Sequence, residues 1–345
     1  MKKITVIGHF GFGHDFLNGQ TVKTKILTEE FDRALGVDNV GKIDTHGGKK
    51  KLLALPFILR RALKDSENIM MLPAHNGIKV ITPLLVFFNR FYKRKLHYSV
   101  IGGWLSEFVK NRKWLAKRLK RFDHIYVETS TMKKALDSQG FNNVTVVPNC
   151  KKLTPLKPEE LVYPIGEPYK LCTFSRVMKE KGIEDAINAV KAVNEKYGRT
   201  VYELDIYGQI DQSQTDWFEE LKKEFPEYVN YGGLVPFDKS VEVLKDYFAL
   251  LFPTRFYTEG IPGTIIDAYA DGIPVISAKW ESFADIIEDG KTGIGYEFGD
   301  SKLLIDILDN LQGNIEKVNS MKDSCLERSK DYLPEFANVQ IFQRM

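Results

Sequence analysis

Short runs of β-branched and aromatic residues alternate with longer stretches of helical periodicity along the first half of the chain. The runs that favour strands are Ile4–Ile7, Ile69–Leu72, Tyr98–Ile101, Ile125–Val127 and Val144–Val147. Stretches that favour helices, such as Gln20–Leu35 and Val109–Arg121, lie between them. This alternation is typical of a parallel sheet covered by helices, so the pattern predicts an α/β domain.

The alternation stops at a proline-rich segment and then starts again. Residues 151–169 hold four prolines and a glycine, and proline disfavours both helix interiors and sheet ladders. Beyond this segment, the runs that favour strands are Leu171–Phe174, Tyr202–Tyr207, Ala249–Phe252 and Pro274–Ile276. The repeated pattern therefore predicts a second domain of the same class.

We expect two doubly wound, Rossmann-like domains that face each other across a cleft. The first covers residues 1–155, a linker covers 156–169, and the second covers 170–330. We expect the segment from about 330 to 345 to cross back onto the first domain. Ligands of such domains bind outside the carboxyl ends of the strands, so functional motifs are expected directly after strands.

The composition is that of an ordinary folded protein. Of the 345 residues, 43% are hydrophobic and 28% are charged, which excludes a disordered or collagen-like chain. The cysteines, Cys150, Cys172 and Cys325, lie far apart without metal-binding spacing, which fits a reducing compartment. The longest apolar stretches, Leu52–Leu59 and Val80–Phe88, fall short of the roughly 20 residues of a spanning helix. With no signal-peptide pattern, we expect a cytoplasmic location.

The net charge of +3 conceals two halves of opposite sign. Residues 1–150 hold 26 Lys and Arg against 12 Asp and Glu, so the remainder is acidic. The segment 109–122 is the most basic, and Leu115, Leu119 and Phe122 line one face of the expected helix. This combination predicts an element that lies on an anionic membrane surface, as a peripheral protein on the inner face of the cell membrane would have.

Two alternatives remain for this basic half. The leucines of the segment would pack inward if the helix were only a solvated face of the domain. Nucleic acid is not expected as a partner, because no nucleic-acid motif accompanies the charge. Lys49–Lys64 and Arg90–Lys95 add further cations to the same half.

A glycine-rich loop, Gly8–His14, follows the first expected strand. Glycine lets the backbone approach a phosphate closely, which makes Gly13, and Gly19 at the start of the next helix, candidate phosphate-facing residues. Phe16 occupies the place of the third small residue of a dinucleotide-binding loop. An NAD-dependent oxidoreductase is therefore a less favoured alternative, and a connection without a ligand is another.

Two cations lie in the loop Ser175–Gly182, between an expected strand and an amphipathic helix. Arg176 offers a planar fork of donors and Lys181 a point charge, and together they suit a diphosphate. Two solvated surface cations are the alternative.

The segment Thr258–Ala268 is the most distinctive of the chain. Glu259 opens a Gly-Ile-Pro turn, and Asp267 follows eight positions later, about two helical turns on. The turn and the helix start would present backbone N–H groups to an anion, and the carboxylates would accept hydrogen bonds from sugar hydroxyls. Alternatively, Glu259 only caps the helix and Asp267 is solvated.

These motifs together resemble the family 4 retaining glycosyltransferases, which have the GT-B fold. Thr258–Ala268 is similar to the E-x7-E region of that family, and Ser175–Gly182 to its donor-diphosphate loop. Further segments that fall in the family's order are Asn18–Thr21, Val147–Asn149, Tyr207-Gly208, Gly232–Val235 and Asp289–Gly293. The resemblance extends from about residue 4 to residue 296. Asn18–Thr21 is similar to the N-terminal segment of those members of the family that build polysaccharides.

The resemblance implies a metal-independent hexosyltransferase without a resident cofactor. It would move a sugar from a nucleotide-sugar, with UDP as the expected nucleotide, to a saccharide or lipid-linked acceptor in cell-surface polysaccharide synthesis. The catalytic residues would be Glu259, Arg176 and Lys181, and the donor-binding residues Gly13, Gly19, Gly260, Ile261, Pro262 and Asp267. Glu259 would orient the donor sugar, while Arg176 and Lys181 would neutralise the diphosphate.

Two departures from the family pattern matter. The second carboxylate of the E-x7-E region is Asp267 rather than glutamate, which leaves open a GT-B-shaped binding or scaffolding protein without turnover. The loop after Tyr98–Ile101 lacks the histidine that many members carry there. His75, after the preceding expected strand, is a candidate cleft-facing residue instead, and His9 and His14 in the glycine loop are similar candidates.

Overall fold

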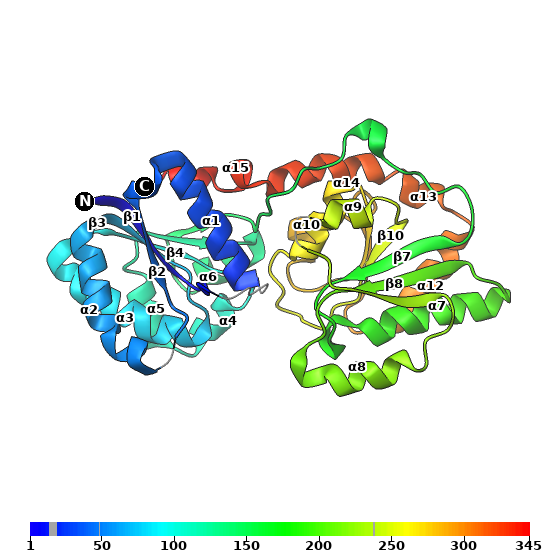
Figure 1. Cartoon of the computed structure of the whole chain (residues 1–345), viewed down its shortest axis with the longest axis horizontal. Helices are drawn as coiled ribbons and strands as arrows, with labels where there is room; N and C mark the ends of the chain where they lie inside the picture. Colours follow the sequence, from blue (N-terminus) through cyan, green and yellow to red (C-terminus); the bar gives the residue numbers. More distant parts are fainter. Residues whose placement is uncertain (14–18, 48, 237–238) are drawn as a thin grey trace. The chain divides into compact units, whose positions relative to one another are not determined.

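Two six-stranded parallel sheets organise the residues that the computed structural model describes, which are 1–13, 19–47, 49–236 and 239–345 (Figure 1). Each sheet lies in its own compact unit. Unit 1 comprises Met1–Lys151 and Leu333–Met345, and unit 2 comprises Lys152–Tyr332. The α/β class expected from the alternation of strands and helices is confirmed.

The sheet of unit 1 has the strand order β2-β1-β3-β4-β5-β6. Its strands are β1 (Lys2–Gly8), β2 (Val40–Asp44), β3 (Ser66–Met71), β4 (Lys95–Ser99), β5 (His124–Val127) and β6 (Val144–Val146). Four of them lie on the expected apolar runs, and β4 overlaps the expected Tyr98–Ile101 only at Tyr98 and Ser99. The edge strand β2 was not expected, because only Val40 and Gly41 of its residues are buried.

Helices cover both faces of this sheet. They are α1 (Gly19–Leu35), α2 (Lys49–Asp65), α3 (His75–Tyr92), α4 (Leu105–Lys110), α5 (Lys113–Leu119) and α6 (Ser130–Ser138), with a 3₁₀ turn at Val37–Asn39. One apolar cluster joins α2 to α6 to one face of the sheet. A second cluster places Leu27 and Phe31 of α1 against the other face.

The C-terminal segment packs on unit 1. It contains α15 (Pro334–Ala337) and α16 (Val339–Phe342). Ile341 is fully buried beside α1, and the ring of Phe342 meets that of Phe31 edge to face at 5.4 Å. Lys95 Nζ donates to the backbone oxygen of Met345 at 2.6 Å. Residues 333–345 therefore complete the second apolar cluster of unit 1.

The sheet of unit 2 has the order β12-β11-β10-β7-β8-β9. Its strands are β7 (Tyr169–Phe174), β8 (Tyr202–Tyr207), β9 (Val229–Gly233), β10 (Ala249–Phe252), β11 (Val275–Ala278) and β12 (Gly293–Tyr296). The two edge strands, β9 and β12, were not expected, because glycines and polar residues interrupt their apolar pattern.

The helices of unit 2 also cover both sheet faces. They are α7 (Ile183–Tyr197), α8 (Thr215–Lys222), α9 (Ser240–Leu244), α10 (Gly263–Ala270), α11 (Phe283–Ile286), α12 (Ser301–Gln312), α13 (Glu316–Asn319) and α14 (Lys322–Ser329). Short 3₁₀ turns lie at Pro158–Glu160, Lys179–Lys181, Gln212–Gln214 and Lys330–Tyr332. Helices α7 and α12 contribute to one apolar cluster and α10 and α14 to the other.

The proline-rich residues 152–169 belong to unit 2. The amide of Leu156 donates to the backbone oxygen of Ala270 at 2.8 Å, and Leu161 is buried. The hydroxyl of Tyr163 donates to Asp323 at 3.3 Å. The segment expected as a linker at 156–169 is thus packed along the second unit.

The basic segment 109–122 is not one amphipathic helix. It is divided between α4 and α5, with Asn111 and Arg112 between them. Leu115 and Leu119 are fully buried and Phe122 nearly so, all in the apolar cluster beneath α2 to α6. The prediction that these three residues face a membrane is wrong, because the core of unit 1 already covers them.

Candidate functional site

The loop between β7 and α7 carries both predicted diphosphate cations. Its middle is anchored by Val177, which is fully buried and whose amide donates to the backbone oxygen of Gln209 at 2.9 Å. Arg176 beside it is exposed, and its guanidinium lies 3.5 Å from Asp211 Oδ2. Such a partly solvated contact leaves the arginine available to another anion.

Gly182 closes this loop against the end of β10. Its φ is +70°, and a Cβ at this position would lie 2.0 Å from the backbone oxygen of Pro253. Only glycine therefore permits both the left-handed backbone and the close approach. The approach brings the β7–α7 loop against the segment that follows β10.

Lys181 and Glu259 form an ion pair across this contact, although 78 positions separate them in the chain. Both side chains are largely buried. Thr254 Oγ1 donates to the same carboxylate oxygen at 3.2 Å, and Lys181 Nζ lies 5.2 Å from the centre of the Phe256 ring. The structure thus joins two residues that the sequence analysis assigned to one site, and it places the ammonium in partly apolar surroundings.

Arg255 holds the same segment from the other side, and the sequence analysis did not single it out. Its guanidinium donates two hydrogen bonds to Asp185 of α7, at 3.0 and 2.8 Å. Its amide donates to the backbone oxygen of Glu180 at 2.8 Å. Asp185, through these hydrogen bonds, raises the pKa of Arg255 above its ordinary value. A single arginine in a variable-looking loop gives no sequence signal of such pairing.

The turn Gly260–Pro262 leads into α10. All three residues of the turn are buried. The helix starts at Gly263, and the hydroxyl oxygen of Thr264 in its first turn is buried without a hydrogen-bond partner among the residues described. The amides of a first helical turn and a hydroxyl at the same end are donors suited to a phosphate oxygen.

Asp267 is 2% exposed, so the alternative that it is a solvated helix residue is excluded. Its Oδ1 accepts a hydrogen bond from Ser240 Oγ at 2.8 Å. Ser240 is the first residue of α9. The carboxylate of Asp267 therefore ties α10 to α9 at the position where the resemblance implies a nucleotide contact.

A second carboxyl lies one helical turn further along. Burial, followed by the charge of Asp267, raises the pKa of Asp271 to about 9. Both of its carboxyl oxygens are buried without a hydrogen-bond partner in the described part of the chain. Burial lowers the pKa of the neighbouring Lys322 to about 8. The C-terminal end of α10 thus holds buried ionisable side chains, and Asp271 is neutral near pH 7.

The candidate residues of unit 1 lie at the carboxyl end of its sheet. Gly13 has a φ of +84° and Gly19 begins α1, and a Cβ on either would meet no atom within 4 Å. The positive φ explains why glycine occupies position 13. Close packing explains neither Gly13 nor Gly19. His14, Phe16 and Asn18 lie outside the described residues.

The glycine loop is held by a carboxylate that the sequence analysis missed with β2. Asp44, the last residue of that strand, accepts hydrogen bonds from the amides of Phe10, Phe12 and His46 at 3.0, 3.1 and 2.8 Å. Burial acts to raise its pKa, but these backbone hydrogen bonds prevail and hold the pKa of Asp44 below its ordinary value. A bound carboxylate here shapes the loop rather than acting as a base.

His75 begins α3 and is exposed. Its ring stacks on Trp104 with centroids 3.9 Å apart and meets the edge of Phe108 at 5.2 Å. Partial burial lowers the pKa of His75 below its ordinary value, and the charges of Lys79 and Arg112 act in the same direction. The loop that lacks a histidine therefore supplies Trp104, against which a histidine from the preceding strand end is packed.

A buried ion pair lies beneath this edge of unit 1. Lys23 Nζ of α1 is 2.6 Å from Glu128 Oε1, directly after β5, and also donates to the backbone oxygen of Val100 at 3.1 Å. The pair connects the ends of β4 and β5 to α1. Single charges at positions 23 and 128 carry no motif, so the sequence analysis did not find them.

Among residues 1–13, 19–47, 49–236 and 239–345, no three His, Cys, Asp or Glu side chains converge as a metal site would require. No helix in those ranges is at once long and apolar enough to cross a bilayer.

Most of unit 2 matches a protein-family model. Residues 168–314 match the model described as "Glycosyl transferases group 1". The matched range is less than half of the chain. It includes the Lys181–Glu259 ion pair, Arg176 and Asp267.

Curated proteins similar to parts of the chain come from polysaccharide-producing bacteria. The chain is 28% identical over 161 residues to an uncharacterised 41.2 kDa protein in the cps region of Klebsiella pneumoniae, which covers 47% of this chain and 41% of that protein. It is 25% identical over 159 residues to the amylovoran biosynthesis glycosyltransferase AmsK of Erwinia amylovora, covering 45% and 39%. The putative colanic acid biosynthesis glycosyltransferase WcaL of Salmonella typhimurium is 26% identical over 132 residues, covering 37% and 32%. The chain thus spans about 40% or less of the length of these relatives.

Solved structures match the whole chain at low identity. Anabaena HepE in complex with UDP has a TM-score of 0.78 at 15% identity, with 99% of each chain covered. Sucrose-phosphate synthase from Thermosynechococcus elongatus has a TM-score of 0.77 at 14% identity, with 99% of this chain and 98% of that chain covered. The GT-B fold expected from the sequence is confirmed.

Proposed function

We propose that the chain is a retaining glycosyltransferase of capsule or exopolysaccharide synthesis, with a nucleotide-sugar as donor and a saccharide or lipid-linked acceptor. The observation that carries this proposal is the Lys181–Glu259 ion pair beside the start of α10. It joins a cation and a carboxylate next to the first turn of α10, within the range that matches the glycosyltransferase model. The names of the relatives AmsK and WcaL support the polysaccharide context.

Unit 2 would hold the donor diphosphate. Lys181 and Arg176 would neutralise its oxygens, and charge-assisted hydrogen bonds of this kind are among the strongest available to a protein. The amides of the first turn of α10 and the Thr264 hydroxyl would supply neutral donors. Since Glu259 already pairs with Lys181, the diphosphate would compete for the ammonium, and the carboxylate would turn to the hydroxyls of the donor sugar.

Charge develops on the leaving diphosphate as the bond from the sugar's anomeric carbon to phosphate oxygen breaks. Donors that are already oriented towards that oxygen lower the barrier, because they need no rearrangement during the reaction. The acceptor hydroxyl oxygen forms the new bond to the anomeric carbon, and its proton passes to the departing phosphate oxygen. This path needs neither a protein base nor a metal ion, and none is proposed.

The remaining donor-binding residues keep narrower proposed roles. Gly260, Ile261 and Pro262 would shape the sugar side of the site, because the turn is buried and leads into α10. Asp267 would take the ribose hydroxyls of the nucleotide from the fixed position that Ser240 imposes. UDP is the proposed nucleotide, and the UDP bound by HepE, which has the same fold, supports that choice.

Unit 1 would bind the acceptor and an anionic membrane surface. The exposed ring of His75 stacks on the half-buried ring of Trp104 at the carboxyl end of the sheet of unit 1. Aromatic faces of this kind are suited to sugar rings. Gly13 and Gly19 stay proposed phosphate-facing residues. The basic character of residues 1–150 supports the membrane surface as a partner, at the inner face of the cell membrane.

A thermal-shift screen with UDP, GDP, ADP and their sugars tests the donor proposal. A nucleotide at 100 times its dissociation constant adds about 2.7 kcal/mol of stability, which is readily measured. The donor that stabilises the chain is then used in a transfer assay with a saccharide acceptor, and the product anomer is read by NMR. Retention supports the proposal, whereas binding without any turnover supports a scaffolding protein, and no binding of any nucleotide contradicts both.

A further inference from the structure

Unit 1 leaves large apolar side chains exposed on α2 and α3. Leu53 and Phe57 of α2 are 79% and 76% exposed, and Phe87 and Phe91 of α3 are 53% and 74% exposed. Each pair is four residues apart, so each lies on one side of its helix. Single exposed apolar residues are ordinary, but two such pairs on neighbouring helices mark an interaction surface. We name this surface the α2–α3 face.

The two helices that carry the face are joined to each other. Arg60 Nε donates to the Tyr92 hydroxyl at 3.1 Å, and Arg94 Nε donates to the backbone oxygen of Leu63 at 3.0 Å. Both helices pack on the same side of the sheet through one apolar cluster. Their outward sides therefore point away from that side of the sheet (Figure 1).

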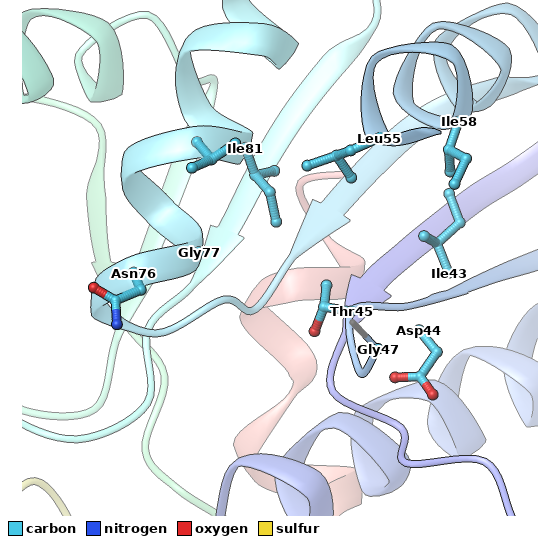
Figure 2. Close-up of a pocket in the computed structure, with 10 residues that line it drawn as sticks. Ile43, Asp44, Thr45, Gly47, Leu55, Ile58, Asn76, Gly77 and Ile81 are labelled. Atoms are coloured by element: carbon cyan, nitrogen blue, oxygen red, sulfur yellow. The ribbon is translucent and has the colours of Figure 1, made fainter. Parts of the chain in front are cut away.

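A cavity of about 300 Å³ lies between these helices at their N-terminal halves. Figure 2 shows aliphatic side chains converging on it from both helices and from the end of β2. These side chains are Ile43, Leu55, Ile58, Val80 and Ile81. The polar groups Asp44, Thr45 and Asn76 complete the lining. An aliphatic lining without aromatic rings suits a hydrocarbon chain better than a sugar.

The charge of the region identifies the partner. Residues 49–95 contain 11 Lys and Arg but only two acidic residues. Arg61, Lys64, Lys79, Arg90 and Lys93 are exposed among them. A second copy of the chain on this face would bring like charges together, whereas an anionic lipid surface would complement them.

We propose that the α2–α3 face docks on an anionic lipid bilayer and that the cavity between the helices takes one hydrocarbon chain of a lipid. This inference deepens the membrane partner of the proposed function and rests on it. The exposed phenylalanines and leucine enter the apolar layer, and the surrounding cations meet the headgroups. The docking element is therefore α2 with α3, and not the segment 109–122 on which the sequence analysis placed it.

Vesicle sedimentation tests the face. The full chain is incubated with vesicles of phosphatidylcholine containing 30% phosphatidylglycerol, or of phosphatidylcholine alone, at two salt concentrations. We expect binding to the anionic vesicles only, weakened by salt. The double variant Phe57→Ser, Phe91→Ser should lower the partition coefficient at least tenfold. Trp114→Ser, which changes an aromatic residue of α5 that is 44% exposed, is the matched control and should change it less than twofold.

Binding of cis-parinaric acid, a fluorescent fatty acid, tests the cavity. Val80 is 38% exposed at the cavity, and Val339 of α16 is 40% exposed elsewhere on unit 1. Val80→Trp should weaken binding of the probe at least tenfold, and Val339→Trp should leave it unchanged. Equal binding by both variants would overturn the cavity assignment.

UDP binding by each variant separates this inference from the proposed function. All four variants should bind UDP as the parent chain does, because none of the substituted residues is among the proposed donor-binding residues. Loss of vesicle binding in Trp114→Ser but not in the phenylalanine variant would overturn the α2–α3 face. Equal binding to neutral vesicles, or capture of an acidic protein but of no vesicle, would also overturn it. Absence of UDP binding with vesicle binding intact would contradict only the donor proposal.

Discussion

Units 1 and 2 have the same architecture, but they hold the groups at the carboxyl ends of their strands in different ways. In unit 2, Gly182 packs against Pro253, Arg255 is paired with Asp185, and Lys181 is paired with Glu259. In unit 1, a Cβ on Gly13 would meet open space, and His75 is exposed. Unit 2 therefore holds these groups in close contacts, whereas Gly13 and His75 of unit 1 lie at a more open edge.

This difference is what we expect if unit 2 binds the diphosphate of the donor, which does not vary, and unit 1 binds acceptors, which do. A diphosphate has the same shape in every nucleotide-sugar, so a preformed site loses little by being rigid. Acceptor saccharides and lipids differ among polysaccharides, and an open edge with apolar and aromatic surfaces suits such variety. Four experiments test whether the units differ in this way.

The largest effect is expected at Gly182. Gly182→Ala would place a Cβ against the backbone oxygen of Pro253 at 2.0 Å, in a left-handed conformation. We expect a loss of about 3–5 kcal/mol in the free energy of unfolding of unit 2, the range for combined strain and overpacking. Gly13→Ala, with a similar φ but no neighbour, should cost about 1–2 kcal/mol. Urea denaturation measures both, and equal losses would remove the contrast between the units.

Lys181→Ala and Arg176→Ala test the donor site itself. Each should lower the rate of sugar transfer at least tenfold, because a hydrogen bond to a charged group contributes about 1.5–3 kcal/mol. Calorimetric titration with the cognate nucleotide and a transfer assay measure the effect. Lys191→Ala, on an exposed side chain of α7, is the control and should change neither. Normal turnover by both site variants would mean that the diphosphate binds elsewhere.

The stability of unit 2 should fall as the pH rises towards 8 because of Asp271. Its folded-state pKa of about 9 exceeds the ordinary value of 3.8, so the folded state binds more protons between these values. Stability from this group is complete below about pH 4 and is lost as the pH rises to 9, by at most about 1.4 kcal/mol per pH unit. Asp271→Asn should flatten this slope.

Urea denaturation midpoints at pH 5.5 and 7.5 measure the pH dependence that Asp271 causes. Both values lie below the pH range in which Lys322 changes the stability. The lowered pKa of Lys322, about 8, adds stability only as the pH rises above that value. We expect the difference between the two midpoints to shrink in the Asp271→Asn variant. An unchanged difference would mean that the Asp271 carboxyl is ionised in the folded chain.

The smallest effect is expected in unit 1. His75→Ala removes the stack on Trp104 and should lower the free energy of unfolding of unit 1 by about 0.5–1 kcal/mol. Nucleotide affinity should not change, because His75 is not among the proposed donor-binding residues. A transfer rate that falls while nucleotide affinity stays constant would sharpen the assignment of acceptor binding to unit 1.

Central strands such as β1 and β10 were predictable from the sequence because most of their residues are buried on both faces. β10 is an unbroken apolar run, and in β1 only Thr5 interrupts the apolar residues of Ile4–Ile7. The edge strands β2, β9 and β12 carry polar or glycine residues, and their pairing depends on neighbours that the local pattern does not contain. Missing β2 also meant missing Asp44, which holds the glycine loop.

The sequence analysis assigned Lys181 and Glu259 to one site because both follow expected strands of one sheet, but it did not predict that the two side chains pair. Arg255, Thr264 and the Lys23–Glu128 pair were not predictable, because isolated polar residues gain their partners only through tertiary contacts. The prediction for residues 109–122 was wrong because its pattern of leucines and seven cations fits two structures. The leucines can face a bilayer, or they can pack into the protein core. Burial of Leu115 and Leu119 decides for the core.

The return of residues 333–345 to unit 1 sets an order for folding during synthesis. Ile341 and Phe342 complete the cluster around Phe31, yet they are translated after all of unit 2. Unit 2, whose residues 152–332 are contiguous, has its full set of contacts first. The apolar cluster around Phe31 therefore stays incomplete, with part of its surface exposed to solvent, until Ile341 and Phe342 have been synthesised.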